Sequence, residues 1–261
     1  MLTHPLLEQL QKMRLTGMHK ALQEQMQMDE CQSMTFEERL GLMLDRETTE
    51  RENRRLQTLL RKATLHQQAA IEDLDHHTPR SLDRQLMTRL RSMQWVRERL
   101  NLLITGPTGI GKSWIACALG NKACREGHST RYFRLSRLFQ ALQLARADGT
   151  WTKLLRELAR TDLLILDDWG LTPIQDEQRR DLLEILDDRF NAKSTLIASQ
   201  LPIDHWHDYI DDPTLADAIL DRLVHNAYRV QLRGESMRKR QAIPQGEAAH
   251  LPPSSESAVT A

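Results

Sequence analysis

Residues 106–113 carry the pattern in this chain that is best suited to chemistry, the sequence GPTGIGKS. Its glycines, lysine and serine stand at the spacing GxxxxGK[ST] of phosphate-binding loops. Glycines let the backbone curl so that its N–H groups point at phosphate oxygens, and a helix start adds partial positive charge. Lys112 is expected to reach the β- and γ-phosphates, and the Ser113 hydroxyl to bind Mg²⁺. The predicted contacts to the cofactors ATP and Mg²⁺ are Gly106, Pro107, Thr108, Gly109, Ile110, Gly111, Lys112, Ser113 and Trp114.

A second pattern, LLILDD, ends in the acids that such a loop requires. Its four apolar residues predict a buried central strand, and ligands of open α/β sheets bind at the carboxyl ends of strands. Asp167 is expected to hold Mg²⁺ through water, and Asp168 to polarise the attacking water. Because Asp is shorter than the Glu of many hydrolytic relatives, a module that binds ATP and hydrolyses it poorly remains an alternative.

The sequence STLIASQ predicts another strand of the same sheet, ending in polar residues. A polar side chain at the tip of the strand beside the magnesium strand can touch the γ-phosphate or the water. Gln200 is the preferred candidate, with Ser199 second.

The helices and strands that would position these residues follow two different sequence patterns, which meet near residue 95. Before it, apolar residues recur at helical spacing, and Thr35 with Glu38 forms a capping-box pattern, so helix is expected throughout. After it, short apolar runs alternate with helical segments, which indicates an α/β fold with a parallel sheet covered by helices on both faces. The expected organisation is a small all-helical domain, an ATPase domain and a disordered tail, at residues 1–95, 96–240 and 241–261.

Composition narrows the function classes. Hydrophobic residues make up 40% of the chain and charged residues 28%, and no apolar run approaches the roughly 18 residues of a membrane span. The three cysteines follow no metal or disulfide spacing. A cytoplasmic protein without a membrane partner is therefore expected. Lys+Arg (36) balances Asp+Glu (36), so bulk charge gives no argument for nucleic-acid binding.

With these features the whole chain, from about residue 6 to 240, resembles the IstB-like transposition helper ATPases of the AAA+ class, which are close to the DnaC-like helicase loaders. The resemblance rests on the segments LLEQLQKMRLTGM, FEERLGLML, NLLITGPTGIGKSWIACALG, LLILDDWG, STLIASQLP, LADAILDRLVHNAYRV and GESMRKR.

The resemblance implies an AAA+ P-loop NTPase core with a five-stranded parallel sheet, a helical appendage, and a homo-oligomer with ATP between protomers. Arg222 matches the arginine finger that reaches a neighbour's γ-phosphate, and Arg238 matches an arginine that contacts ATP. It further implies assembly on duplex DNA with little sequence preference and a partner transposase that does the cutting. A helicase loader is the nearest alternative.

Local basic residues are candidates for the DNA contacts. Arginines around the strand and helix after the loop helix have few acids nearby, although scattered surface charge explains them equally well. The candidates are Arg131, Arg134, Arg137, Arg146 and Lys153.

Overall fold

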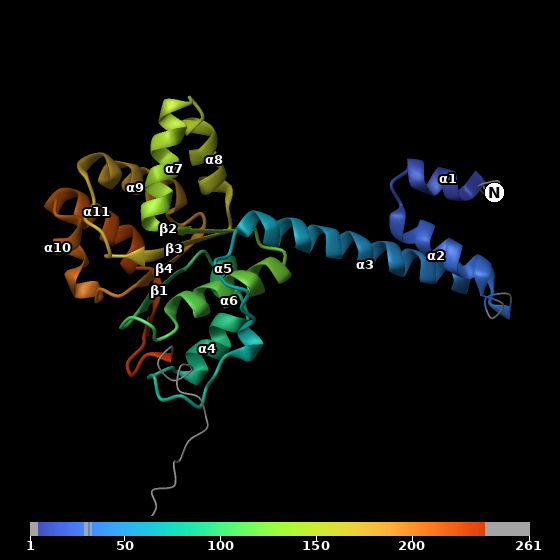
Figure 1. The fold of residues 1–261 in the computed structure, drawn as a ribbon, viewed down its shortest axis with the longest axis horizontal. Coiled ribbons are helices and arrows are strands. Elements are labelled where there is room, and N and C mark those ends of the chain that lie inside the picture. Colours follow the sequence, from blue (N-terminus) through green and yellow to red (C-terminus); the bar gives the residue numbers. More distant parts are fainter. Residues whose placement is uncertain (1–4, 29–30, 32, 238–261) are drawn as a thin grey trace, which may run out of the picture.

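The computed structural model describes residues 5–28, 31 and 33–237. It consists of an α/β body and a helical arm that projects from it along one long helix (Figure 1). The arm contains α1 (Pro5–Lys12), α2 (Thr16–Gln27) and α3 (Phe36–Ala63). The body contains the elements η2 (Ile71–Asp73), α4 (Arg84–Arg91), α5 (Gln94–Arg97), β1 (Asn101–Thr105), α6 (Lys112–Arg125), β2 (Thr130–Arg134), α7 (Leu135–Ala147), α8 (Trp151–Arg160), β3 (Leu163–Trp169), α9 (Asp176–Arg189), β4 (Ser194–Ser199), η3 (Ile203–His205), α10 (Trp206–Ile210), α11 (Pro213–Val224) and β5 (Ala227–Gln231).

The sheet has five strands in the order β2-β3-β4-β1-β5, and every neighbouring pair is parallel. This confirms the predicted α/β core with a five-stranded parallel sheet. The carboxyl ends of β1, β3 and β4 therefore meet at one edge of the sheet, and β2 lies at its side, hydrogen-bonded only to β3 among the described strands.

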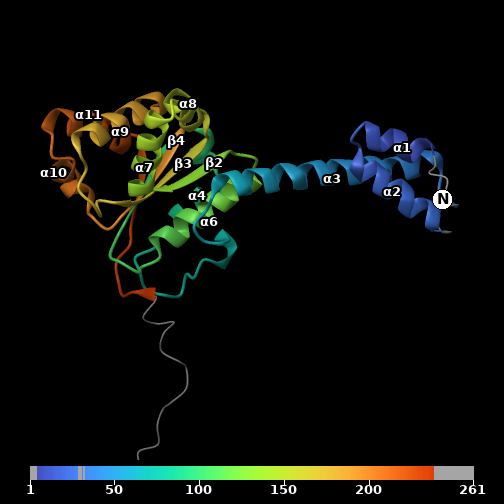
Figure 2. The same ribbon diagram turned by 45° about the horizontal axis from the view of Figure 1, so that its top comes forward.

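Alternate residues of the strands face two separate cores. Leu102, Ile104 and Ile165 pack with α4, α5 and α6 on one face. Leu103, Leu164 and Ile197 pack with the helices α7 to α11 on the other. Figure 2 shows helices on both sides of the sheet. Burial on both faces explains why these strands are almost continuously apolar in sequence.

The arm is stabilised mainly where α2 crosses α3. The buried carboxylate of Glu47 accepts hydrogen bonds from the backbone N–H groups of Gly17 (2.7 Å) and Met18 (3.2 Å), at the start of α2. A carboxylate is favourable there because the first N–H groups of a helix have no intrahelical partner. The predicted capping box at the start of α3 is also present, with Glu38 N donating to Thr35 Oγ1 at 3.3 Å.

Residues 64–83 contain less helix than expected for this region. Thr64 ends α3 in the left-handed conformation (φ 50°), and only the short η2 follows before α4. The next helix begins at Arg84, where the side chain of Asp83 caps it. The apolar side chains of Ala69, Ile71 and Leu74 are buried against the body core. Tertiary packing against the body explains their apolar character.

Within the described residues, no helix is both long enough and apolar enough to cross a membrane.

Candidate nucleotide site

The predicted phosphate-binding loop connects β1 to α6, as its sequence requires. Gly106, Gly109 and Gly111 have φ of 151°, 78° and 102°, values that other residues rarely adopt, so the glycines are needed for the curl of the loop. Lys112 is buried, and its Nζ donates to the carbonyl oxygens of Gly106 (2.7 Å) and Pro107 (2.9 Å). Burial lowers the pKa of Lys112, while the charges of Asp167 and Asp168 oppose that shift.

A cavity of about 650 Å³ opens beside this loop. Its size lies in the range of ligand pockets, about 300–1,000 Å³. It is lined by the loop and α6, by the strand ends after β3 and β4, and by the segment between α3 and α4. The residues that line it include Asp75, Arg80, Thr108, Gly109, Gly111, Lys112, Ser113, Trp114, Asp167, Asp168, Gln200 and Met237.

The two acids lie near the end of β3, where its pairing with β4 is irregular. The register of the two strands shifts between Leu166 and Trp169, and Asp168 has a left-handed φ of 60°. A bulge re-aims the side chains of a strand, and a non-glycine residue with positive φ is uncommon outside functional sites and turns. The bulge brings both carboxylates to the border of the cavity.

Tyr132 on β2 orients the first acid. Its hydroxyl donates to Asp167 Oδ2 at 2.7 Å, and the N–H of Asp168 donates to Asp167 Oδ1 at 2.9 Å. Asp167 is 3% exposed, so these two donors are its fixed partners. Burial raises the pKa of Tyr132, and its hydrogen bond to Asp167 raises it further, so the phenol remains a donor.

Arg134, also on β2, contacts the second acid. Its Nε lies 3.5 Å from Asp168 Oδ2, and its Nη2 lies 2.8 Å from Nε2 of His66. Arginine only donates, so this ring nitrogen of His66 is the acceptor. Burial raises the pKa of Asp168, the charge of Asp167 adds to the rise, and Arg134 opposes it.

Tyr132 and Arg134 contact the acid pair and His66 contacts Arg134, yet no sequence pattern predicted these contacts. Arg134 was expected at DNA. The available signal was positional: β2 pairs with β3 in register, so that Arg134 lies beside Asp167. His66 lies 68 residues before Arg134 in the sequence, and no local pattern indicates that the two side chains meet.

The structure separates the two polar candidates after β4. The side chain of Gln200 lines the cavity, and Thr108 Oγ1 of the loop donates to its Oε1 at 2.6 Å. Ser199 is fully buried, and its hydroxyl donates to the carbonyl oxygens of Trp169 (2.8 Å) and Leu201 (3.0 Å). The geometry therefore favours Gln200 over Ser199 as a residue that can face a nucleotide.

The oxygen donors at this edge fit Mg²⁺. The described residues contain no cluster of three or more His, Cys, Asp or Glu that could hold a metal. Mg²⁺ needs no such cluster, because it is usually bound by one or two protein oxygens with waters and substrate phosphates. Ser113 and the buried carboxylate of Asp167 border the same cavity and offer hard oxygen ligands of this kind.

Arg222 lies away from the loop of its own chain. Asn101, the first residue of β1, donates to the backbone oxygen of Arg222 at 2.9 Å, whereas the loop follows the last residue of β1. The guanidinium of Arg222 pairs with Asp187 on α9 and donates to the carbonyl oxygen of Ala218 at 2.8 Å. Arg238 and the expected tail lie outside the described residues.

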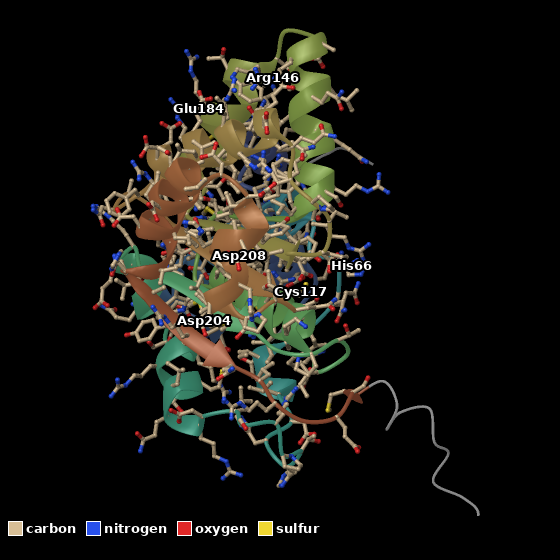
Figure 3. The ribbon with its side chains drawn as sticks, turned by 90° about the vertical axis from the view of Figure 1, so that its left-hand side faces the viewer. His66, Cys117, Arg146, Glu184, Asp204 and Asp208 are labelled. Carbon is tan, nitrogen blue, oxygen red and sulfur yellow. The ribbon has the colours of Figure 1, made fainter. Side chains whose placement is uncertain are left out.

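Three of the five candidate DNA contacts are paired with acidic side chains. Arg131 is paired with Glu157 at 3.5 Å, and Arg134 with Asp168. Arg146 lies over the ring of Trp151 and pairs with Asp181 of α9 and Glu177, which ties α7 to α9. In Figure 3, Arg146 lies well away from His66, the neighbour of Arg134. Arg137, bonded to Gln140 at 2.9 Å, and Lys153 are exposed and remain candidates.

Comparison with known proteins agrees with this geometry. The family described as IstB-like ATP binding protein matches residues 8–244. An insertion sequence ATP-binding protein of Sinorhizobium fredii is 52% identical over 241 residues, covering 92% of this chain and 98% of the relative. The insertion sequence IS21 ATP-binding protein of Pseudomonas aeruginosa is 30% identical over 205 residues, covering 78% of this chain and 77% of the relative.

Solved structures show the same fold at low identity. The DnaC helicase loader has a TM-score of 0.52 at 20% identity and covers 63% of this chain and 96% of its own. The DnaI structure has a TM-score of 0.55 at 20% identity, over 63% of this chain and 91% of its own. The family match over nearly the whole chain, together with the 52% identity to the Sinorhizobium relative, shows that this chain belongs to the family of IstB-like ATP binding proteins.

Proposed function

We propose that this protein is an ATP-dependent DNA-binding helper ATPase that assembles on duplex DNA and regulates a partner transposase. The observation that carries the proposal is one cavity bordered by Lys112, Ser113, Asp167 and Asp168. It occurs in a chain that is related over most of its length to insertion-sequence ATP-binding proteins.

The residues around the cavity support hydrolysis of ATP. Loop N–H groups and Lys112 would hold the phosphates, and Ser113 and Asp167 would hold Mg²⁺, which when bound neutralises charge on the β- and γ-phosphates. Asp168 would orient the attacking water and accept its proton, since burial and the neighbouring acid raise its pKa. Gln200 would contact the γ-phosphate or that water.

The site would be completed by a second protomer. Arg222 lies at the opposite edge of the sheet from its own loop, so it would serve a neighbour's γ-phosphate, with Arg238 contacting ATP from the C-terminal side. A guanidinium supplied in trans stabilises transition-state charge and makes hydrolysis depend on assembly. In the resting chain Arg222 is paired with Asp187, so it would have to exchange this partner when protomers assemble.

Sizing on duplex DNA tests the assembly. The protein is mixed with DNA and with ADP, ATP or a slowly hydrolysed ATP analogue, and the mass of the complexes is measured. We expect oligomers on DNA with ATP and the analogue but not with ADP. Equal complexes in all three nucleotides would contradict the proposal. Phosphate release with and without DNA and Mg²⁺ distinguishes an ATPase from a module that only binds ATP.

A DnaC-like helicase loader is the second candidate, because the structure of the DnaC helicase loader shares the fold. Likeness at 20% identity shows the fold alone, whereas the insertion-sequence relatives reach 52% identity. The reading frame that adjoins the gene distinguishes them. A transposase gene supports the helper, and a replication gene supports the loader.

A further inference from the structure

Arg80 is a buried cation beside the phosphate-binding loop that belongs to no recognised motif. It lies between η2 and α4, borders the nucleotide cavity, and is only 4% exposed. Buried arginines are rare unless they are paired. None of the described carboxylates forms an ion pair with Arg80 within 4.0 Å. A salt bridge therefore does not explain why this arginine is buried.

The guanidinium of Arg80 instead binds two backbone carbonyl groups. Nη1 donates to the oxygen of Ile110 in the loop at 3.3 Å, and Nη2 donates to the oxygen of Asp75 at 2.7 Å. Its Nε has no partner among the described residues. The guanidinium of arginine is planar and presents its N–H donors in a rigid fork, whereas the ammonium of lysine is a compact charge on a flexible stem.

The bond to Ile110 fixes the direction of the next N–H group. Peptide 110–111 is trans and planar, so its C=O and N–H point to opposite sides. With the oxygen of Ile110 held by Arg80, the N–H of Gly111 points to the side of this peptide opposite to that hydrogen bond. The guanidinium also packs closely against Gly111, because a Cβ at this position would lie 2.9 Å from Arg80 Nη1.

A second carbonyl of the loop is held from outside in the same way. The N–H of Met237 donates to the oxygen of Gly109 at 2.9 Å, and the N–H of Arg233 donates to the oxygen of Arg80 at 3.1 Å. Arg80 and the segment 233–237 therefore support the loop together. The loop depends on partners that are distant in the sequence for its conformation.

The segment that carries Arg80 is itself held by a local turn. The carboxylate of Asp75 accepts from the N–H groups of His77 (2.7 Å) and Thr78 (3.3 Å) and from the Thr78 hydroxyl. Asp side chains that bond the backbone two residues ahead stabilise such turns. The hydroxyl of Thr78, then the two N–H groups, hold the pKa of Asp75 at about 2, so this turn persists at neutral pH.

We propose that Arg80 is a positioning residue for nucleotide binding, which presents the Gly111 N–H to the phosphates that ATP and ADP share. The inference rests on the proposed function of the cavity. Because the β-phosphate is common to both nucleotides, loss of Arg80 weakens ATP and ADP alike, and it raises KM more than it lowers kcat. A contact to the γ-phosphate would weaken ATP alone.

Equilibrium titration with fluorescent ATP and ADP analogues tests this. Arg80→Gln removes the charge and the fork, Arg80→Lys keeps the charge alone, and Arg84→Gln is the control because Arg84 is an exposed arginine at the start of α4. We expect Kd for both nucleotides to rise about tenfold in Arg80→Gln, which corresponds to about 1.4 kcal/mol. Arg80→Lys should show at least a threefold rise, and the control none.

Three results would overturn the assignment. They are a Kd within twofold of wild type in both Arg80 variants, a loss confined to ATP, and a lower melting temperature with unchanged Kd. Should Arg80→Gln not fold, Arg80→Lys and its KM and kcat decide the question. Failure of the wild type to bind either nucleotide would instead reject the proposed function itself, so the two failures are distinguishable.

Discussion

Replacing Tyr132 by Phe tests how much the hydrogen bond from Tyr132 to Asp167 contributes to stability and to Mg²⁺ binding. The substitution keeps the buried ring and removes only the hydroxyl, which lies 2.7 Å from Asp167 Oδ2. The carboxylate is 3% exposed, so water cannot readily replace the lost donor. A hydrogen bond to a charged group contributes about 1.5–3 kcal/mol. Tyr132→Phe should therefore destabilise the protein by about 2 kcal/mol.

Two measurements follow from that loss. Thermal unfolding should shift down by roughly 4–8 °C, at about 2–4 °C per kcal/mol for a chain of this size. Asp167 would keep only the Asp168 N–H as a fixed donor, so more Mg²⁺ should be needed for half-maximal phosphate release. ADP affinity without Mg²⁺ should remain as in wild type. An unchanged melting temperature together with an unchanged Mg²⁺ requirement would refute the reasoning.

Four further outcomes are expected. Lys112→Ala should abolish nucleotide binding in a filter or fluorescence assay, and retained binding would contradict the role of the loop. Arg222→Ala should bind ATP but lose about 10³-fold or more in hydrolysis, and mixing it with Asp168→Asn should restore part of the rate if the finger acts in trans. Burial and the neighbouring acid raise the pKa of Asp168, and a base must be ionised to act. The apparent pKa at which kcat falls on acidification should therefore lie above the ordinary Asp value of about 3.9. An apparent pKa at or below that value argues against Asp168 as the base. Arg137→Ala should reduce the salt slope of DNA binding by about 1, and an unchanged slope would remove Arg137 from the DNA contacts.

The features that sequence predicted well are those that local spacing determines. The loop pattern, the capping box of Thr35 and Glu38, and the runs NLLIT and LLILDD each depend on neighbours a few residues apart. The helix Lys112–Arg125 was predicted with its observed bounds, because the loop marks its start and Gly127, with φ 83°, marks its end.

The features that sequence missed depend on contacts between distant segments. Arg80 meets Ile110, and His66 meets Arg134, across 30 and 68 residues. The segment between α3 and α4 was expected within a wholly helical region, but it contains only the short η2, and Ile71 is buried there against the body. Periodicity reports which side chains are buried, and the element that buries them follows only from the tertiary structure.

The position of β2 explains why the arm and the acid pair are connected. As an edge strand β2 has one side without a strand partner, and such edges are usually covered by another element. The end of α3 provides that cover, since Arg131 of β2 donates to the oxygen of Lys62 at 3.5 Å and Thr64 Oγ1 donates to the oxygen of Tyr132 at 3.4 Å. The residues that follow bring His66 to Arg134, which contacts Asp168. The segment that closes the sheet edge is thus also the one that joins the projecting arm to the acids.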